Sequence, residues 1–140
     1  MTQAMCTSFK LELLRAEHDF TAGGHQFKCA LYTGQAALGP DTTAYSPANE
    51  VVSPNYLPGG FGLTNVDPSA DGTVVMQTFS GNPSWDLVSF TTSQALIYNS
   101  SAGDKAVAVL DFGGSCTVLK GTFTIHLPPV TPTTALLRFL

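Results

Sequence analysis

The sequence predicts a mainly β protein, either an antiparallel β-sandwich or a jelly-roll-like barrel, with one short N-terminal α-helix. Three observations favour this class. Nine prolines and thirteen glycines are spread over 140 residues, as in chains of short strands joined by turns. Several segments alternate apolar and polar residues, which is typical of strands. Helical spacing of apolar residues occurs only near the N-terminus. Because 140 residues is the length of one typical domain, residues 1–140 are expected to form a single β-rich domain.

The N-terminal part is expected to contain a short lead, residues 1–6, followed by the helix, residues 7–20. The hydroxyl group of Thr7 or Ser8 is expected to cap the helix, and Gly23–Gly24 to end it. The helix is predicted from four apolar residues that recur at helical spacing, namely Phe9, Leu13, Ala16 and Phe20.

Strands are expected over much of residues 26–140, which would form the sandwich. A strand at 26–33 precedes a long loop, 34–60, in which four prolines exclude a central strand and whose length is typical of functional loops. The clearest feature is a hairpin at 94–112, because two apolar runs flank a polar turn that contains a glycine. Its faces are both apolar, so we expect them to be covered on both sides, by a second sheet or by a neighbouring subunit. The other strands are expected at 61–66, 73–79, 85–90, 122–127 and 135–140.

The charge distribution argues against nucleic acid as a partner. The net charge is −4, and charged residues make up 11% of the chain, against about 25% in a typical soluble domain. No Lys or Arg occurs between Lys28 and Lys105, whereas phosphate binding requires clustered cations. A surface with so few charges favours association with other proteins or with further copies of the chain.

The cysteines and the N-terminus indicate a reducing compartment. Cys6, Cys29 and Cys116 have no spacing typical of a disulfide framework or a zinc site, so they are expected to be free thiols. The first residues lack the apolar core of a signal peptide, and no apolar run approaches the roughly 20 residues of a membrane span. The sequence therefore predicts synthesis in the cytoplasm and no membrane partner.

No pattern typical of catalysis, of a cofactor or of a metal is found. His18, His25 and His126 lack metal-ligand spacing, and Gly114–Ser115–Cys116 lacks the second glycine of a serine-nucleophile elbow and is expected to be a turn. Four acids are expected in turns, where Asp is favoured for its backbone hydrogen bonds: Asp41, Asp67, Asp71 and Asp104. The protein is therefore expected not to be an enzyme, and glycan hydrolysis by paired acids is a remote alternative.

The larger aromatic side chains leave two interpretations open. They either pack in the core or form an exposed face for a sugar or a subunit, since aromatic residues anchor interfaces well. These residues are Tyr32, Tyr45, Tyr56, Trp85 and Tyr98.

Several spaced blocks between residues 7 and 127 occur together. They are Ser8-Phe9-Lys10, His18-Asp19-Phe20, FKCALYT at 27–33, Leu38-Gly39 with DTTAY at 41–45, Asn49-Glu50-Val51, Tyr56 with Gly59-Gly60, ALIYNS at 95–100 and DKAVAVLDFG at 104–113. This set resembles a family of small virion proteins encoded by tailed bacteriophages and prophages. The resemblance implies a structural protein with no catalytic residue, either a capsid decoration protein or a tail-fibre-like protein.

The first hypothesis is a capsid decoration, or cement, protein. Made in the bacterial host cytoplasm, it would sit on the capsid surface of the virion as a homotrimer and bind several copies of the major capsid protein at once. We expect the contacts to come from the N-terminal lead, from the loop between Asp41 and Pro58, and from the apolar tail. The candidate interface residues are Thr2, Met5, Asp41, Tyr45, Tyr56, Pro58, Leu137 and Phe139.

The alternative keeps the protein in the virion but places it on the tail, as a fibre-associated module that binds a receptor or a glycan. Its distinguishing feature would be exposed aromatic side chains in the long loop, Tyr45 and Tyr56 first.

Overall fold

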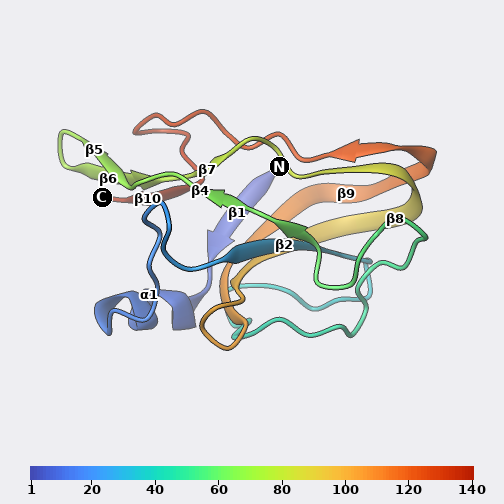
Figure 1. Ribbon diagram of the computed structural model, residues 1–140, viewed down its shortest axis with the longest axis horizontal. Helices are drawn as coiled ribbons and strands as arrows, with labels where there is room; N and C mark the ends of the chain where they lie inside the picture. Colours follow the sequence, from blue (N-terminus) through green and yellow to red (C-terminus); the bar gives the residue numbers. More distant parts are fainter.

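The computed structural model describes residues 1–140 and contains one helix and ten strands (Figure 1). The prediction of a mainly β, antiparallel protein with one short N-terminal helix is confirmed. The elements are β1 (Thr2–Met5), α1 (Thr7–Leu14), β2 (Phe27–Tyr32), β3 (Phe61–Gly62), β4 (Thr64–Asn65), β5 (Ser69–Asp71), β6 (Val74–Gln77), β7 (Phe79–Ser80), β8 (Ser84–Asn99), β9 (Lys105–Thr124) and β10 (Leu137–Phe139).

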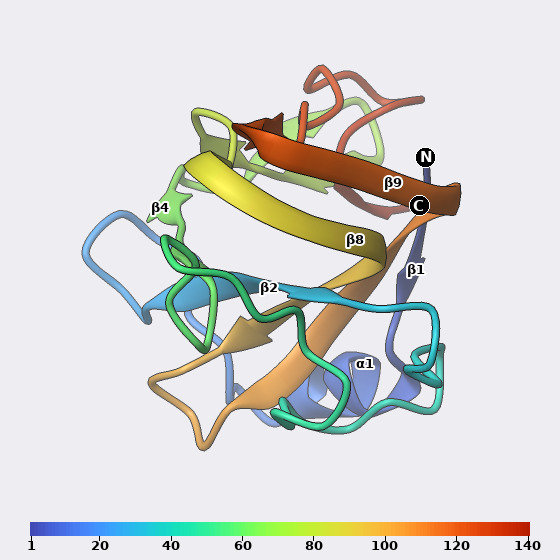
Figure 2. The same ribbon diagram turned by 90° about the vertical axis from the view of Figure 1, so that its right-hand side faces the viewer.

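The strands form three antiparallel sheets, one large and two small. The largest sheet has five strands in the order β1-β9-β8-β2-β3, and two smaller sheets have the orders β10-β6-β5 and β4-β7. The long strands β8 and β9 bend, so that their outer halves lie on the opposite side of β2 from α1 (Figures 1 and 2). The result is a sandwich-like arrangement rather than a flat sheet. No helix is both long enough and apolar enough to span a membrane.

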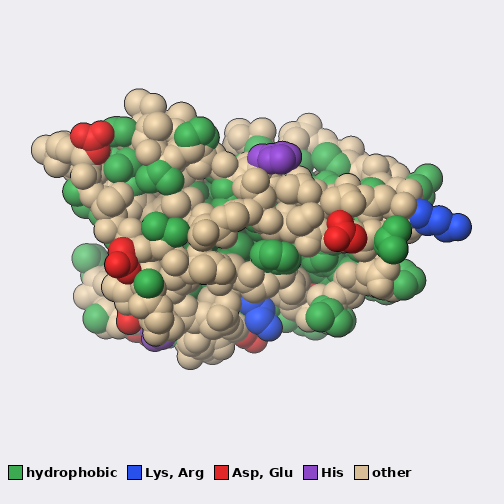
Figure 3. Space-filling view, turned by 45° about the horizontal axis from the view of Figure 1, so that its top comes forward, with side chains coloured by type: hydrophobic (Ala, Val, Ile, Leu, Met, Phe, Trp, Pro, Cys, Tyr) green, Lys and Arg blue, Asp and Glu red, His purple; other side chains and the backbone are tan.

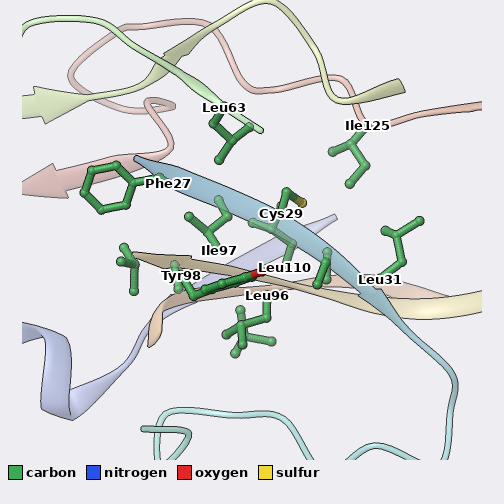
Figure 4. Packing of buried hydrophobic residues seen from close by; sticks show 14 of the residues in the cluster. Phe27, Cys29, Leu31, Leu63, Leu96, Ile97, Tyr98, Leu110 and Ile125 are labelled. Atoms are coloured by element: carbon green, nitrogen blue, oxygen red, sulfur yellow. The ribbon is translucent and has the colours of Figure 1, made fainter. Parts of the chain in front are cut away.

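The hairpin formed by β8 and β9 supplies the centre of the core. Residues 95–98 and 106–110 are all buried, so both apolar faces are covered, as expected, and the cover comes from the same chain. Leu63 and Ile125 lie on one side of the sheet, whereas Leu96 and Tyr98 lie on the other (Figure 4). The polar turn after Asn99 contains Gly103 and Asp104, both with positive φ, and this agrees with the predicted hairpin turn.

Two pairs of expected elements are joined in the structure. The strand expected at 85–90 lies within the first half of β8, and residues 122–124 of the strand expected at 122–127 form the end of β9. The hairpin is therefore much longer than 94–112. Gly114–Ser115–Cys116, expected to be a turn, lies within β9, where Gly113 and Gly114 have positive φ near the bend. Glycine tolerates this conformation without a Cβ clash.

The N-terminal predictions for 1–6 and 7–20 are partly wrong. Residues 2–5 are not a free lead but the strand β1, which pairs with β9 from Thr2↔Asp111 to Met5↔Ala108. The helix ends at Leu14, and Ala16 has a positive φ of 58°, so the chain turns away before Phe20. Phe20 is nevertheless buried, because it stacks on Phe27 with a ring-centroid distance of 4.3 Å.

The start of the helix also differs from the expectation. Neither Thr7 nor Ser8 caps it: the N-cap residue is Cys6, which makes no capping hydrogen bond with its side chain. The Cys6 thiol is buried instead. The backbone leading into the helix is held by neighbours far away in the sequence, since the Thr7 amide donates to the Pro40 carbonyl oxygen at 2.9 Å. Tertiary contacts therefore take the place of a local cap.

The long loop does not fold independently. Residues 34–60 contain only isolated bridges, Tyr32↔Glu50 and Ala44↔Lys105, that connect the loop to the central sheet. Gly60 marks the closest approach: its φ is +89°, and a Cβ atom there would lie 2.0 Å from the Cys29 carbonyl oxygen. Only glycine permits the loop to pack so closely on β2.

Candidate interaction surface

The loop that carries four of the candidate residues is anchored on a buried glutamate. The Glu50 side chain accepts a hydrogen bond from the Tyr45 hydroxyl at 2.6 Å, from the Tyr56 hydroxyl at 2.6 Å and from the Gly59 amide at 2.9 Å. The Tyr56 hydroxyl also accepts from the Leu31 amide of β2 at 2.9 Å. Burial of the Glu50 carboxyl group is tolerated because these hydrogen bonds replace the ones that it would make to water.

Two further tyrosines complete this network. Tyr98 donates to the Gly59 carbonyl oxygen at 2.6 Å and stacks on Tyr45, and Tyr32 donates to the Ser46 carbonyl oxygen at 2.8 Å. Burial raises the pKa of Tyr98 to about 12, and burial together with Glu50 raises the pKa of Tyr56 as well. Each hydroxyl therefore stays protonated and acts as a donor with a fixed acceptor. The arrangement holds the loop in place and offers no nucleophile or base.

The aromatic residues of the sequence thus mostly belong to the core. Trp85, Tyr32, Tyr56 and Tyr98 are buried, and Tyr45 is half-buried. Tyr56, which the tail alternative requires to be exposed, is buried instead, and its ring lies 5.9 Å from the Trp85 ring of β8. Of these five aromatic side chains, only Tyr45 keeps partial exposure.

A second polar network surrounds a histidine that no sequence pattern indicated. The His18 side chain is fully buried, and its Nε2 lies 2.9 Å from Glu12 Oε1. Asn99 Nδ2 lies 3.0 Å from His18 Nδ1 and 2.9 Å from His25 Nδ1. The Asn99 Oδ1 atom accepts from the Ser101 amide, which orients the Asn99 amide as the donor to both rings. His18 Nε2 then carries the proton that Glu12 accepts, so both ring nitrogens of His18 have a partner.

The other residues considered as metal ligands or nucleophiles do not come together in one site. The structure contains no group of three His, Cys, Asp or Glu side chains arranged to hold a metal ion. Burial raises the pKa of the Cys6 thiol to about 11 and that of Cys29 to about 12, so neither is a thiolate near neutral pH. Asp67 Oδ1 accepts from the Ala22 amide at 2.7 Å, a structural role of the kind expected for the acids in turns.

The two terminal strands come together and form a groove. Met5, Lys10, Arg138, Phe139 and Leu140 line an open depression of about 480 Å³. An adjoining hollow of about 170 Å³ lies between side chains of β1 and β10 and is lined by Gln3, Met5, Leu136, Arg138 and Leu140. Each of these strands pairs on one edge only, β1 with β9 and β10 with β6, so both are edge strands. We call this region the terminal groove.

The structure brings some of the candidate interface residues together and separates others. Met5 and Phe139, 134 positions apart, both line the terminal groove, and Thr2 is exposed on β1. Asp41 is exposed next to Pro40, which contacts the start of α1. Leu137 is only 1% exposed and belongs to the core. Pro58 is exposed, but it lies in the loop held by Glu50 rather than at the groove.

Comparison of the chain with protein-family models, with curated proteins and with solved structures finds no match.

Proposed function

We propose that this protein is a non-enzymatic structural protein of a bacteriophage virion, a capsid decoration protein that binds the outer surface of the major capsid protein lattice and stabilises the head. The observation that carries the proposal is the terminal groove. Two edge strands lie next to each other there, with apolar side chains between them and two cations, Lys10 and Arg138, at the rim. The sequence blocks that resemble small phage virion proteins supply the biological setting.

The groove has the features of a site for an extended segment of a partner protein. Edge strands present unpaired backbone groups that can add a strand, and alternate side chains then enter neighbouring pockets. Lys10 and Arg138 favour an acidic segment of the major capsid protein. In this proposal the protein acts as a homotrimer on the capsid surface, after synthesis in the host cytoplasm, so that weak single contacts add up to stable binding.

The direct test is rebinding to capsids from which the protein has been stripped. We expect the purified protein to co-sediment with such capsids and to raise their temperature of disruption. The double variant Lys10→Glu with Arg138→Glu changes two exposed side chains of the groove and should weaken binding by at least about tenfold. Arg15→Glu, the same kind of charge change on an exposed residue that lines neither the groove nor the adjoining hollow, should bind like the wild type.

The position in the particle is tested by immunogold labelling of intact virions. Gold spread evenly over the heads is the expected result. Gold confined to the tail tip or the fibres would overturn the capsid proposal in favour of a tail-associated protein. Equal binding of the groove variant and the wild type would show that the terminal groove is not the contact surface.

A further inference from the structure

Four aliphatic side chains are exposed at one end of the molecule. Val52 is 90% exposed, Leu57 77%, Leu87 68% and Leu119 78%. We call this surface the apolar end. Isolated exposed apolar residues are common, but a group from separate segments is typical of an interaction surface. Figure 3 shows some of the hydrophobic side chains of this face at the right-hand end of the molecule, with one cationic side chain extending beside them.

The apolar end is built from three segments that hydrogen bonds tie together. The Ser89 amide of β8 donates to the Ser53 hydroxyl at 3.0 Å, and the Lys120 amide of β9 donates to the Ser89 hydroxyl at 2.9 Å. Asn55 Nδ2 donates to the Leu87 carbonyl oxygen at 3.0 Å. The exposed side chains therefore sit on a fixed platform, so that binding there would cost little ordering of the backbone.

The backbone at this end adopts an unusual conformation. Leu87 has φ +52° and Lys120 has φ +47°, the left-handed region that residues with a Cβ atom rarely occupy. Both lie where the pairing of β8 with β9 shifts register between Trp85 and Phe90. Asn55 holds the Leu87 carbonyl oxygen by a hydrogen bond, whereas the Leu87 side chain is 68% exposed. Strain of this kind is characteristic of functional surfaces.

The charges around the apolar end are self-complementary. Lys120 and Asp86 are exposed there, and neither takes part in the Lys105–Glu17 ion pair or in the hydrogen bond between His18 and Glu12. Asp86 accepts only from the Thr122 hydroxyl. In a symmetric assembly, Lys120 of one copy can face Asp86 of the next. The terminal groove, in contrast, carries two cations, so two copies would repel each other there.

We propose that the apolar end is the surface through which copies of this chain associate, with Leu87 and Leu119 at its centre and with Lys120 and Asp86 paired across the contact. This inference rests on the self-association included in the proposed function, but it does not depend on the capsid. Copies joined at the apolar end leave the terminal groove available to a different partner.

Sedimentation equilibrium of the full chain tests the proposal without any capsid. The wild type should have a mass at least twice the 14.7 kDa of a single chain. Leu119→Glu should weaken association by at least about tenfold, because it places a charge among apolar side chains. Leu87→Gly should weaken it as well, although glycine suits the positive φ, so that far-UV circular dichroism and the melting temperature should report an intact or more stable fold. Leu14→Glu, at a leucine that is 88% exposed on α1, is the control and should leave the mass unchanged.

Exchanging the charges of Lys120 and Asp86 distinguishes specific pairing of these residues from non-specific hydrophobic association. Lys120→Asp and Asp86→Lys should each weaken association, and the double variant should restore it. A monomeric wild type, a Leu119→Glu variant that still assembles, or a Leu14→Glu variant that dissociates equally would each overturn the proposal. A monomer that nevertheless rebinds capsids would leave the capsid proposal standing and remove only this inference.

Discussion

The inner and outer halves of the β8–β9 hairpin differ in burial and in the regularity of their strand pairing. In the inner half, residues 94–99 pair with 105–111, and almost every side chain is buried. In the outer half, residues 84–92 pair with 116–124, the register shifts repeatedly, and Leu87 and Leu119 face the solvent. The same two strands are therefore a core element along one part of their length and a surface element along the other.

The difference follows from how many faces are packed. In the inner half both faces are covered, so a slip by one residue would move a complete set of apolar side chains to the wrong side. In the outer half, the buried side chains of Trp85, Val88 and Phe90 belong to the one packed face. The other face is exposed, so the strands are free to bulge there. Bulges there cost little packing and turn side chains outward. A single pair of strands can thus supply both stability and a surface for binding.

The largest expected difference between the two halves is in how much a buried or exposed leucine contributes to the free energy of unfolding. Leu110→Ala removes a fully buried side chain from the inner half and should lower the free energy of unfolding by about 2–5 kcal/mol. Leu119→Ala, the matched change in the outer half, should alter it by less than about 0.5 kcal/mol. Chemical denaturation of both variants, at a protein concentration low enough to keep the chain monomeric, measures the contrast. Similar losses in both variants would contradict the distinction between the halves.

Alkaline pH should act on the inner part of the sheet through Cys29 and Tyr98. Burial raises the pKa of Cys29 from 9.0 to about 12, and it raises that of Tyr98 from 10.0 to about 12. A raised pKa means that the folded state holds its proton more tightly than the unfolded state. The stability is therefore fully present below about pH 9 and falls as the pH rises towards about 12. Denaturation at a series of pH values should show this decline, with a shallower slope for Cys29→Ala; an identical slope would refute the contribution of Cys29.

Thiol labelling should distinguish the halves within one molecule. Cys29 pairs with Ile97 in the inner half and is fully buried, whereas Cys116 pairs with Thr92 in the outer half and is partly exposed. A thiol reagent should therefore modify Cys116 in the native protein and leave Cys29 and Cys6 intact until denaturant is added. Mass spectrometry of the peptides identifies the modified residues. Labelling of Cys29 at the rate of Cys116 would mean that the inner sheet opens readily.

The smallest effect concerns backbone strain. Leu87→Gly should leave the free energy of unfolding of the monomer unchanged or raise it by up to about 1 kcal/mol, because relief of the positive φ offsets the extra freedom of glycine in the unfolded chain. Thermal melts compare it with Ala95→Gly in the inner half, where the side chain is buried in a regular strand and a clear loss is expected. A loss at position 87 as large as that at 95 would show that the Leu87 side chain supports the fold.

The candidate surface was only partly predictable. The terminal tail was correctly expected to form a strand, and Met5 and Phe139, chosen as candidate interface residues, are both half-buried. That they share one groove depends on β1 and β10 meeting, and residues 134 positions apart leave no periodic signal. The apolar end was missed for a similar reason, because Val52 and Leu87 are brought together by hydrogen bonds of Ser53 and Asn55.

The sequence by itself determined the β class, the hairpin with its turn after Asn99 and the burial of its apolar runs, since alternation and turn chemistry act between residues close in the chain. Only the tertiary structure decided that residues 2–5 pair with β9, that the helix ends at Leu14 and that Glu50 gathers two tyrosine hydroxyls and the Gly59 amide. Those outcomes depend on partners distant in sequence. Burial and hydrogen bonding with such partners outweigh the small local preferences that a sequence pattern expresses.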